Sequence, residues 1–302
     1  PILTNGYKKS PSIDINYYRN FKNFSLKEHL NFTNFVADNI HGFYGINNIN
    51  EFQSLIKNPL EGSRFFYNLE VSNSTHFNGY KISSSFGIRG IDYDIENKDR
   101  IKTKSVIVPT FNFDISTSFI KKDSGNSHIV KPRIYYGYVG YKNQENNPVF
   151  DSYKLGMMNQ LFNTNRFTGM DRIGDQNFYT LSIEYKKRHM DMNKISLKLS
   201  QKFYIKDRKV FIDEMSHMQA ESKMTSNSMG MGMMEMSMVP MTMMSGDKGP
   251  LMLMGKWMPS MKTMVMTYGS YSEEMKKFPM AGLTINPVSY THLRAHETAS
   301  HL

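Results

Sequence analysis

The chain has 302 residues and no cysteine, so neither a disulfide framework nor a thiolate metal site is available to it. Its net charge is +10, but the lysines and arginines are scattered rather than gathered into a run, which argues against nucleic acid as a partner. Mean hydropathy is −0.50, and the lack of any apolar run of about 18 residues excludes a transmembrane helix. A transmembrane barrel is not excluded, because strands that alternate lipid-facing and lumen-facing residues average to a polar hydropathy.

Apolar and polar residues alternate with a period of two through most of the chain, which predicts β-strands. About ten strands are expected, the last two weakened by methionine on both faces, and no helix is expected. In chain order they are 12–17, 29–33, 65–71, 80–88, 111–119, 130–138, 179–185, 195–205, 250–257 and 262–271.

The predicted connections alternate between short and long. The short ones lie near 20–24, 73–78, 121–127, 187–193 and 258–261, and the long ones span 37–62, 92–104, 139–177 and 206–248. Transmembrane barrels have this rhythm because their periplasmic turns are tight while their outer loops can grow. Loops of roughly forty residues are unusual in compact soluble domains. The pattern therefore favours an all-β, antiparallel transmembrane β-barrel fragment over a soluble β-sandwich or solenoid.

Two stretches carry a resemblance to a known family: KPRIYYGYVGYKNQENNPVFD at 131–151 and QLFNTNRFTGMDRIGDQN at 160–177. They resemble the C-terminal barrel domain of the LptD family, also called organic-solvent-tolerance proteins. Weaker similarity extends the match to roughly 6–210, through GYKKSPSIDINYY (6–18), VPTFNFDISTSF (108–119) and KISLKLSQKFYIKDRKV (194–210).

The resemblance implies a Gram-negative outer-membrane translocon that inserts lipopolysaccharide into the outer leaflet, and not an enzyme. It implies as partners an LptE-type plug lipoprotein, lipopolysaccharide, a periplasmic lipopolysaccharide-transport bridge and outer-membrane lipid, with no cofactor. The family's jelly-roll domain and closing strands are not visible, so 1–287 is expected to be a partial, incomplete barrel domain. The alternative is a general outer-membrane porin or receptor barrel.

The segment 160–177 interleaves two cations and two carboxylates with glycines. Charges and glycine turns of this kind can hold an irregular loop against a barrel wall. One hypothesis is a loop that contacts the sugar-phosphate path of the lipid; the other is a salt-bridged loop that orders the barrel. No nucleophile or histidine lies nearby, so no catalytic residue is expected. The motif residues are Asn165, Arg166, Gly169, Asp171, Arg172, Gly174 and Asp175.

If the apolar side of each strand faces lipid, basic residues on the other side face the lumen and would meet phosphorylated sugar and lipid A. The candidates are Lys81, Lys131, Arg133, Lys198 and Lys202.

Methionines crowd the predicted loop at 215–248. Thioethers are soft ligands for Cu(I), but a flexible low-complexity loop is the preferred interpretation. The residues that a metal site would use are Met229, Met231, Met233, Met236 and Met238. The tail 288–302 breaks the strand pattern, resembles translated sequencing-adapter read-through, and is expected to be non-native.

Overall fold

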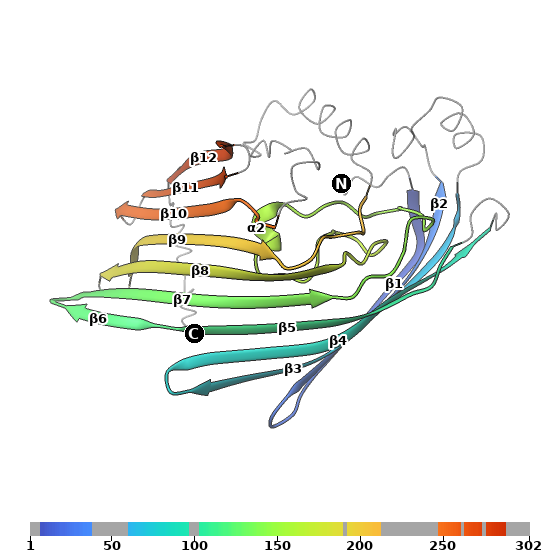
Figure 1. Cartoon of the computed structure of the whole chain (residues 1–302), viewed down its shortest axis with the longest axis horizontal. Coiled ribbons are helices and arrows are strands. Elements are labelled where there is room, and N and C mark those ends of the chain that lie inside the picture. Colours follow the sequence, from blue (N-terminus) through green and yellow to red (C-terminus); the bar gives the residue numbers. More distant parts are fainter. Residues whose placement is uncertain are drawn as a thin grey trace, which may run out of the picture.

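The computed structural model describes residues 7–37, 60–96, 103–189, 192–212, 247–260, 263–273 and 276–287. In these residues the chain forms one twelve-stranded sheet in which strands that follow one another along the chain lie side by side, except that β5 and β6 both pair with β7 (Figure 1). The strands are β1 (Tyr7–Asn20), β2 (Ser25–Ala37), β3 (Gly62–Phe77), β4 (Tyr80–Ile95), β5 (Val106–Thr117), β6 (Phe119–Asp123), β7 (Asn126–Val139), β8 (Gln176–His189), β9 (Met192–Tyr204), β10 (Leu251–Ser260), β11 (Thr263–Ser272) and β12 (Lys277–Pro287).

The sheet is antiparallel throughout and curves into a trough whose open edges are β1 and β12 (Figure 1). The prediction of an all-β, antiparallel and incomplete barrel is thereby confirmed. A single helical turn, α2 (Met157–Gln160), lies in the connection between β7 and β8. In the part of the chain that is described, no helix is both long and apolar enough to cross a membrane.

The structure has two more strands than the sequence pattern predicts. The expected strand at 111–119 is divided at Ser118 into β5 and β6, and both parts pair with β7. The interruption lies opposite Pro132, which has no N–H to donate to the ladder. The other additional strand is β12, whose Pro279 and Gly282 obscure the alternation; proline is tolerated in such an edge strand.

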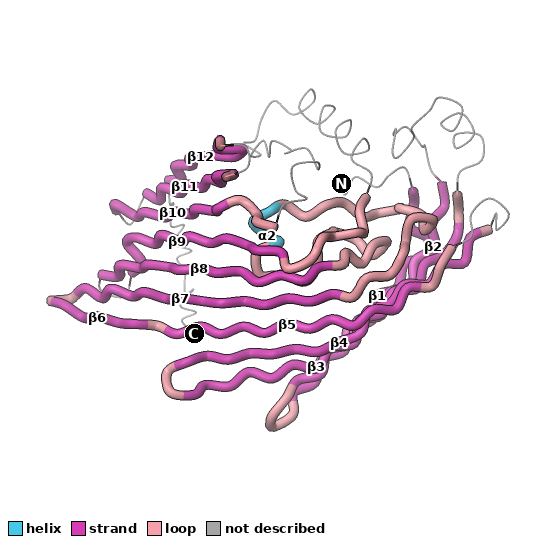
Figure 2. Tube along the Cα trace, viewed as in Figure 1, coloured by secondary structure: helices cyan, strands magenta, loops and turns pink. Residues whose placement is uncertain are grey.

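Tight turns join the strands at one end of the sheet. Between β3 and β4 the turn consists of Asn78 and Gly79, with φ angles of 46° and 81°. A two-residue hairpin of type I′ requires positive φ at both positions, and Asn-Gly is the pair that adopts them most readily. This turn fixes the register that places Phe77 opposite Tyr80. The long connection between β7 and β8, which is described throughout, lies at the other end of the strands, as the alternating loop lengths predict (Figure 2).

Large apolar side chains alternate along the strands and remain exposed on the outer face of the trough. Among them are Leu69, Phe86, Ile134, Leu181 and Leu197, which are between 42% and 58% exposed. The register sets such side chains side by side across the sheet, with Phe86 opposite Phe111. A continuous apolar face of this kind is typical of a surface that contacts lipid or another apolar partner.

Residues 140–175, which we call the inner segment, connect β7 to β8 along the inner side of the trough (Figure 2). Most of the buried apolar residues of the described chain fall into three clusters, and each cluster contains one buried residue of this segment. Ile173 packs with β4, β5 and β7 residues, Phe150 packs with Phe35 and Ile95, and Phe167 packs with Val210 and Ile212. The core therefore lies between the inner segment and the sheet.

Candidate functional site

The inner segment is anchored to the first strands by two carboxylates that share one arginine. Arg64 of β3 donates from Nη1 to Asp171 Oδ1 at 2.5 Å and to Asp151 Oδ1 at 2.6 Å. Lys9 of β1 reaches Asp151 Oδ2 at 2.6 Å. The other oxygen of Asp171 accepts the backbone N–H groups of Phe150 at 2.8 Å and Asp151 at 2.7 Å. Arg64 and the two backbone N–H groups all donate to the Asp171 carboxylate, which is the arrangement that a carboxylate requires.

This cluster is buried, because Arg64 is 1% exposed and Asp171 is 0% exposed. Burial opposes ionisation of Asp151, but hydrogen bonds and charge from Arg64, and then Lys9, hold the pKa of its carboxyl well below the usual range. Burial raises the pKa of Asp171, and Arg64 acts in the opposite direction. The guanidinium of Arg64 also lies over the Phe35 ring, 4.9 Å from its centroid. The ion pairs of Arg64 therefore join β3 to the inner segment in a place shielded from solvent, and the exposed Lys9 joins β1 to the same carboxylate, Asp151, from the solvent side.

The other charged residues of the predicted motif hold the inner segment in shape. Arg166 donates to the Asp175 carbonyl at 2.9 Å, and burial and the charge of Arg208 lower the pKa of Arg166 to about 10. The Asp175 carboxylate accepts the backbone N–H groups of Lys209 and Val210 at 2.8–3.0 Å. Arg172 donates to the carbonyls of residues 147 and 148 at 2.5 and 3.0 Å. All four predicted charges thus make contacts within the protein.

The small residues of the motif allow close backbone approach. Gly169 has φ +66°, and a Cβ there would meet the backbone oxygen of Asp151. A Cβ at Gly174 would lie 2.8 Å from the Phe167 ring. The backbone N–H of Asn165 donates to Asn163 Oδ1 at 2.8 Å in a local turn.

The register places all five predicted basic residues on the inner side of the sheet, where the inner segment also lies. One row across β4 to β9 consists of Lys81, Ser116, Arg133, Ser182 and Ser200. In an adjacent row, Lys131 and Lys198 lie on either side of Glu184. That these positions face the lumen of a barrel remains a prediction.

The five basic residues differ in the contacts that their charged groups make. Lys202 is buried, and its ammonium donates to the Gln160 carbonyl and to Gln176 Oε1, both at 2.9 Å. Arg133 is paired with Asp114, with Nε–Oδ1 at 2.9 Å. Lys198 lies 4.5 Å from the centroid of the Phe162 ring. Two of the five therefore have their charge committed to contacts within the protein.

Sequence reasoning missed the partners that complete this site, above all Arg64, Lys9 and Phe162. Asp151 lies at the end of one of the family-like stretches, but its ion pairs span 87 and 142 positions along the chain. For Arg64 the sequence does contain one signal. It alternates with the outward-facing Phe65, so the period of two assigns it to the inner side of the sheet.

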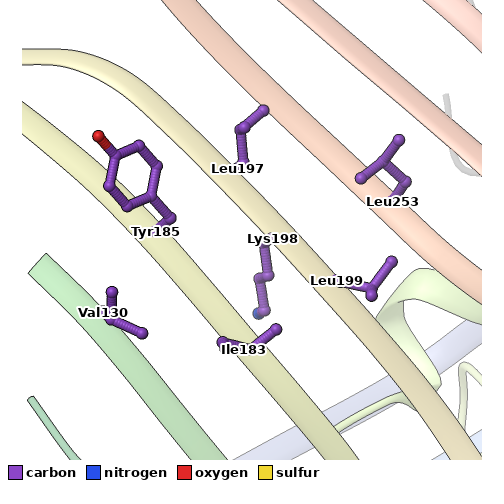
Figure 3. Close-up of a pocket in the computed structure, with 7 residues that line it drawn as sticks. All are labelled: Val130, Ile183, Tyr185, Leu197, Lys198, Leu199 and Leu253. Atoms are coloured by element: carbon purple, nitrogen blue, oxygen red, sulfur yellow. The ribbon is translucent and has the colours of Figure 1, made fainter.

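A shallow apolar depression of about 220 Å³ lies on the outer face of the described strands (Figure 3). Its lining is almost entirely apolar and comes from four neighbouring strands, β7 to β10. The lining residues are Val130, Ile183, Tyr185, Leu197, Leu199 and Leu253, together with Lys198, which borders the depression between Leu197 and Leu199 although its position in the register belongs to the inner side. It continues the exposed apolar surface and offers little polar chemistry for a specific ligand.

Neither the methionines proposed for a metal site nor the tail at 288–302 can be placed, since both lie outside the described residues. Within the described ranges, no group of three or more histidine, aspartate or glutamate side chains is arranged to hold a metal ion.

Comparison with known proteins gives a consistent result. The family model described as "LptD: LPS transport system D" matches residues 2–247. An "LPS-assembly protein LptD" from Acinetobacter baumannii is 32% identical over 139 residues, covering 45% of this chain and 16% of the relative. Proteins with the same description from Francisella tularensis subsp. holarctica and Xanthomonas oryzae pv. oryzae are 37% and 28% identical, covering 39% and 60% of this chain. The matches span 15% and 22% of those two relatives.

Proposed function

The chain belongs to the LptD family, and on that premise we propose that it forms part of a translocon that inserts lipopolysaccharide into the outer leaflet of a Gram-negative outer membrane. The observation that carries the proposal is the division of one curved sheet into two faces. The outer face exposes large apolar side chains along most of its strands, while the inner face carries polar and basic groups. A glycolipid with an apolar and a phosphorylated part needs both kinds of surface.

We further propose that the charges of the inner segment order the barrel rather than contact the lipid. Asp171, Asp175, Arg166 and Arg172 are buried and make contacts within the protein, so they have little capacity left for a ligand. The basic residues of the strands are better placed to meet phosphorylated sugar. Lys81 is exposed on the inner side of β4, and Lys131 is partly exposed on β7.

The proposed partners follow from the family. They are lipopolysaccharide, an LptE-type plug lipoprotein within the completed barrel, a periplasmic transport bridge and the surrounding outer-membrane lipid. The family is one of transport and assembly, so no catalytic step is assigned to the chain. A porin or receptor function is less well supported, because the inner segment packs against the face that an open solute pore would leave free.

The test is depletion of the full-length protein in its own host. Newly made lipopolysaccharide should fail to reach the cell surface, while general porin content and solute uptake should stay unchanged. A full-length copy should restore surface delivery. Normal surface lipopolysaccharide after depletion, together with solute conductance of the purified protein in planar bilayers, would instead identify a channel.

A further inference from the structure

Positive charge is concentrated on the inner side of β7 to β10. Lys131 and Lys198 lie on either side of Glu184 in one row of the register. The neighbouring rows add three more cations on the same side, namely Arg133, Lys186 and Lys256. Asp114 and Glu184 are the carboxylates that face them. Five cations against two carboxylates leave an excess of positive charge, which favours an anion at this place.

Contacts with the two carboxylates account for only two of these cations. Arg133 binds Asp114, with Nη2–Oδ2 at 2.5 Å, and Lys186 binds Glu184 at 2.9 Å. For Lys131, Lys198 and Lys256 the described residues provide no carboxylate within ion-pair distance. The ammonium groups of Lys131 and Lys198 thus have hydrogen-bond donors available for a ligand.

The place between Arg133 and Lys198 is occupied by an aromatic ring from the inner segment. The Phe162 centroid lies 4.0 Å from Arg133 Cζ and 4.5 Å from Lys198 Nζ, and Tyr135 holds the ring edge-on at 6.0 Å. On β8, Ser182 and Glu184 lie between the two cations; Ser182 pairs with Ser200, and the Glu184 carboxylate binds Lys186 at 2.9 Å. When the ring moves away, a space is left that is flanked by cations, bordered by the hydroxyl groups of Ser182 and Ser200, and has beside it a carboxylate already paired with Lys186.

We propose that Lys131, Arg133 and Lys198 form a phosphate-binding site that Phe162 caps, and that a phosphorylated saccharide displaces this ring when it binds. An ionised oxygen accepts charge-assisted hydrogen bonds from Lys198 and from Nη1 of Arg133, since Asp114 engages only Nε and Nη2 of that arginine. Such bonds are roughly twice as strong as neutral ones. These replace a cation–π contact, which is weak where solvent reaches the cation. Ligand binding and docking of the inner segment then compete for the same cations.

The identification of the natural ligand as lipopolysaccharide rests on the proposed function, whereas the existence of the site does not. The site is therefore tested first with free pyrophosphate, by calorimetric titration of the purified full-length protein in detergent. Lys131→Gln/Lys198→Gln should weaken binding at least tenfold. Lys27→Gln/Lys122→Gln removes the same charge from the inner side of β2 and β6, and binding should stay within twofold of the unaltered protein.

A second variant, at the Phe162 ring that caps the site, should strengthen pyrophosphate binding rather than weaken it. Phe162→Leu keeps an apolar side chain but removes the π face, so pyrophosphate should bind at least threefold more tightly. Folding of every variant is checked by heat-modifiable migration in a gel. Equal losses in the two lysine pairs would show general attraction to a basic surface and overturn the site, and weaker binding by Phe162→Leu would overturn the cap.

The source of the phosphate is tested in cells by photo-crosslinking from position 162, with position 16 as an inner-face reference. A lipopolysaccharide adduct at 162 that is lost in Lys131→Gln/Lys198→Gln, but kept in Lys27→Gln/Lys122→Gln, supports the site. An adduct at both positions that ignores Lys131 and Lys198 overturns the site and leaves the proposed function standing. Lysine-dependent pyrophosphate binding with no lipopolysaccharide adduct at either position counts against the proposed function and leaves a site for free phosphate.

Discussion

Replacing Asp171 with asparagine should release the inner segment from the sheet. Asp171 Oδ2 accepts two backbone N–H groups, and Oδ1 accepts Arg64 at 2.5 Å. An asparagine has the same shape as the aspartate, but only one of its two terminal atoms is an oxygen. Its NH₂ group must therefore face either Arg64 or the two backbone N–H groups, all of which are donors. It also leaves Arg64, which is 1% exposed, with fewer negative partners. Breaking a buried ion pair costs about 3–5 kcal/mol.

The lower end of that range applies, because Asp151 still pairs with Arg64 at 2.6 Å. A loss of about 3 kcal/mol corresponds to a rise of roughly a hundredfold in the population of the undocked segment. Proteolysis follows this population when opening and closing are faster than cleavage. Trypsin should therefore cut the full-length protein in detergent roughly a hundredfold faster after Arg166, which is 4% exposed.

Cleavage after the exposed Lys122, which lies in β6 outside the inner segment, provides an internal reference that should not change. Asp207→Asn is the matched control, because Asp207 is exposed and lies outside the inner segment. If Asp171→Asn and Asp207→Asn are cut after Arg166 at the same rate, the ion pairs do not dock the segment and the reasoning is wrong.

Leu181→Lys, on the outer face near the middle of β8, should cost about 2–4 kcal/mol in urea unfolding from lipid vesicles, as expected for a lipid-facing charge. Asn16→Lys, on the inner side of β1, should cost less than about 1 kcal/mol; equal costs would mean that the faces are wrongly assigned. Gly169→Ala places a side chain on a residue with left-handed backbone, at a cost of about 1–2 kcal/mol, and the new Cβ would also clash with Asp151. Amide exchange across 165–175 should therefore rise at least tenfold. Unaltered exchange would show that this turn is not under strain. Because Arg64 and Lys9 lower the folded-state pKa of Asp151, its ionised form stabilises docking above about pH 4, and this contribution is lost as the pH falls through the lower folded value. Amide exchange of the inner segment should rise below pH 4 in the unaltered protein, and Asp151→Asn should abolish that acid-dependent rise.

Much of the sheet follows from local pattern. In β8, Leu181 and Ile183 alternate with Thr180 and Ser182, and this period of two already assigns each side chain to a face. The five basic residues share the inner side for the same reason, since parity propagates across an antiparallel register. The alternating pattern did not predict β12, which contains Pro279, or the division between β5 and β6, which lies opposite Pro132 of β7.

The path of the inner segment could not be derived in this way. It has no periodicity, and its charges could be seen but not their partners, because Asp171 meets Arg64 across 107 positions of the chain. The period of two also does not reveal which cations make contacts within the protein. Lys202 is buried and donates to the Gln160 carbonyl, whereas Lys198 lies over the ring of Phe162. By itself the sequence determined the β class, the two faces and the family resemblance, because alternation and motifs are local properties. Only the tertiary structure decided what covers the inner face and which charges remain available, because ion pairs and burial depend on residues far apart in the chain.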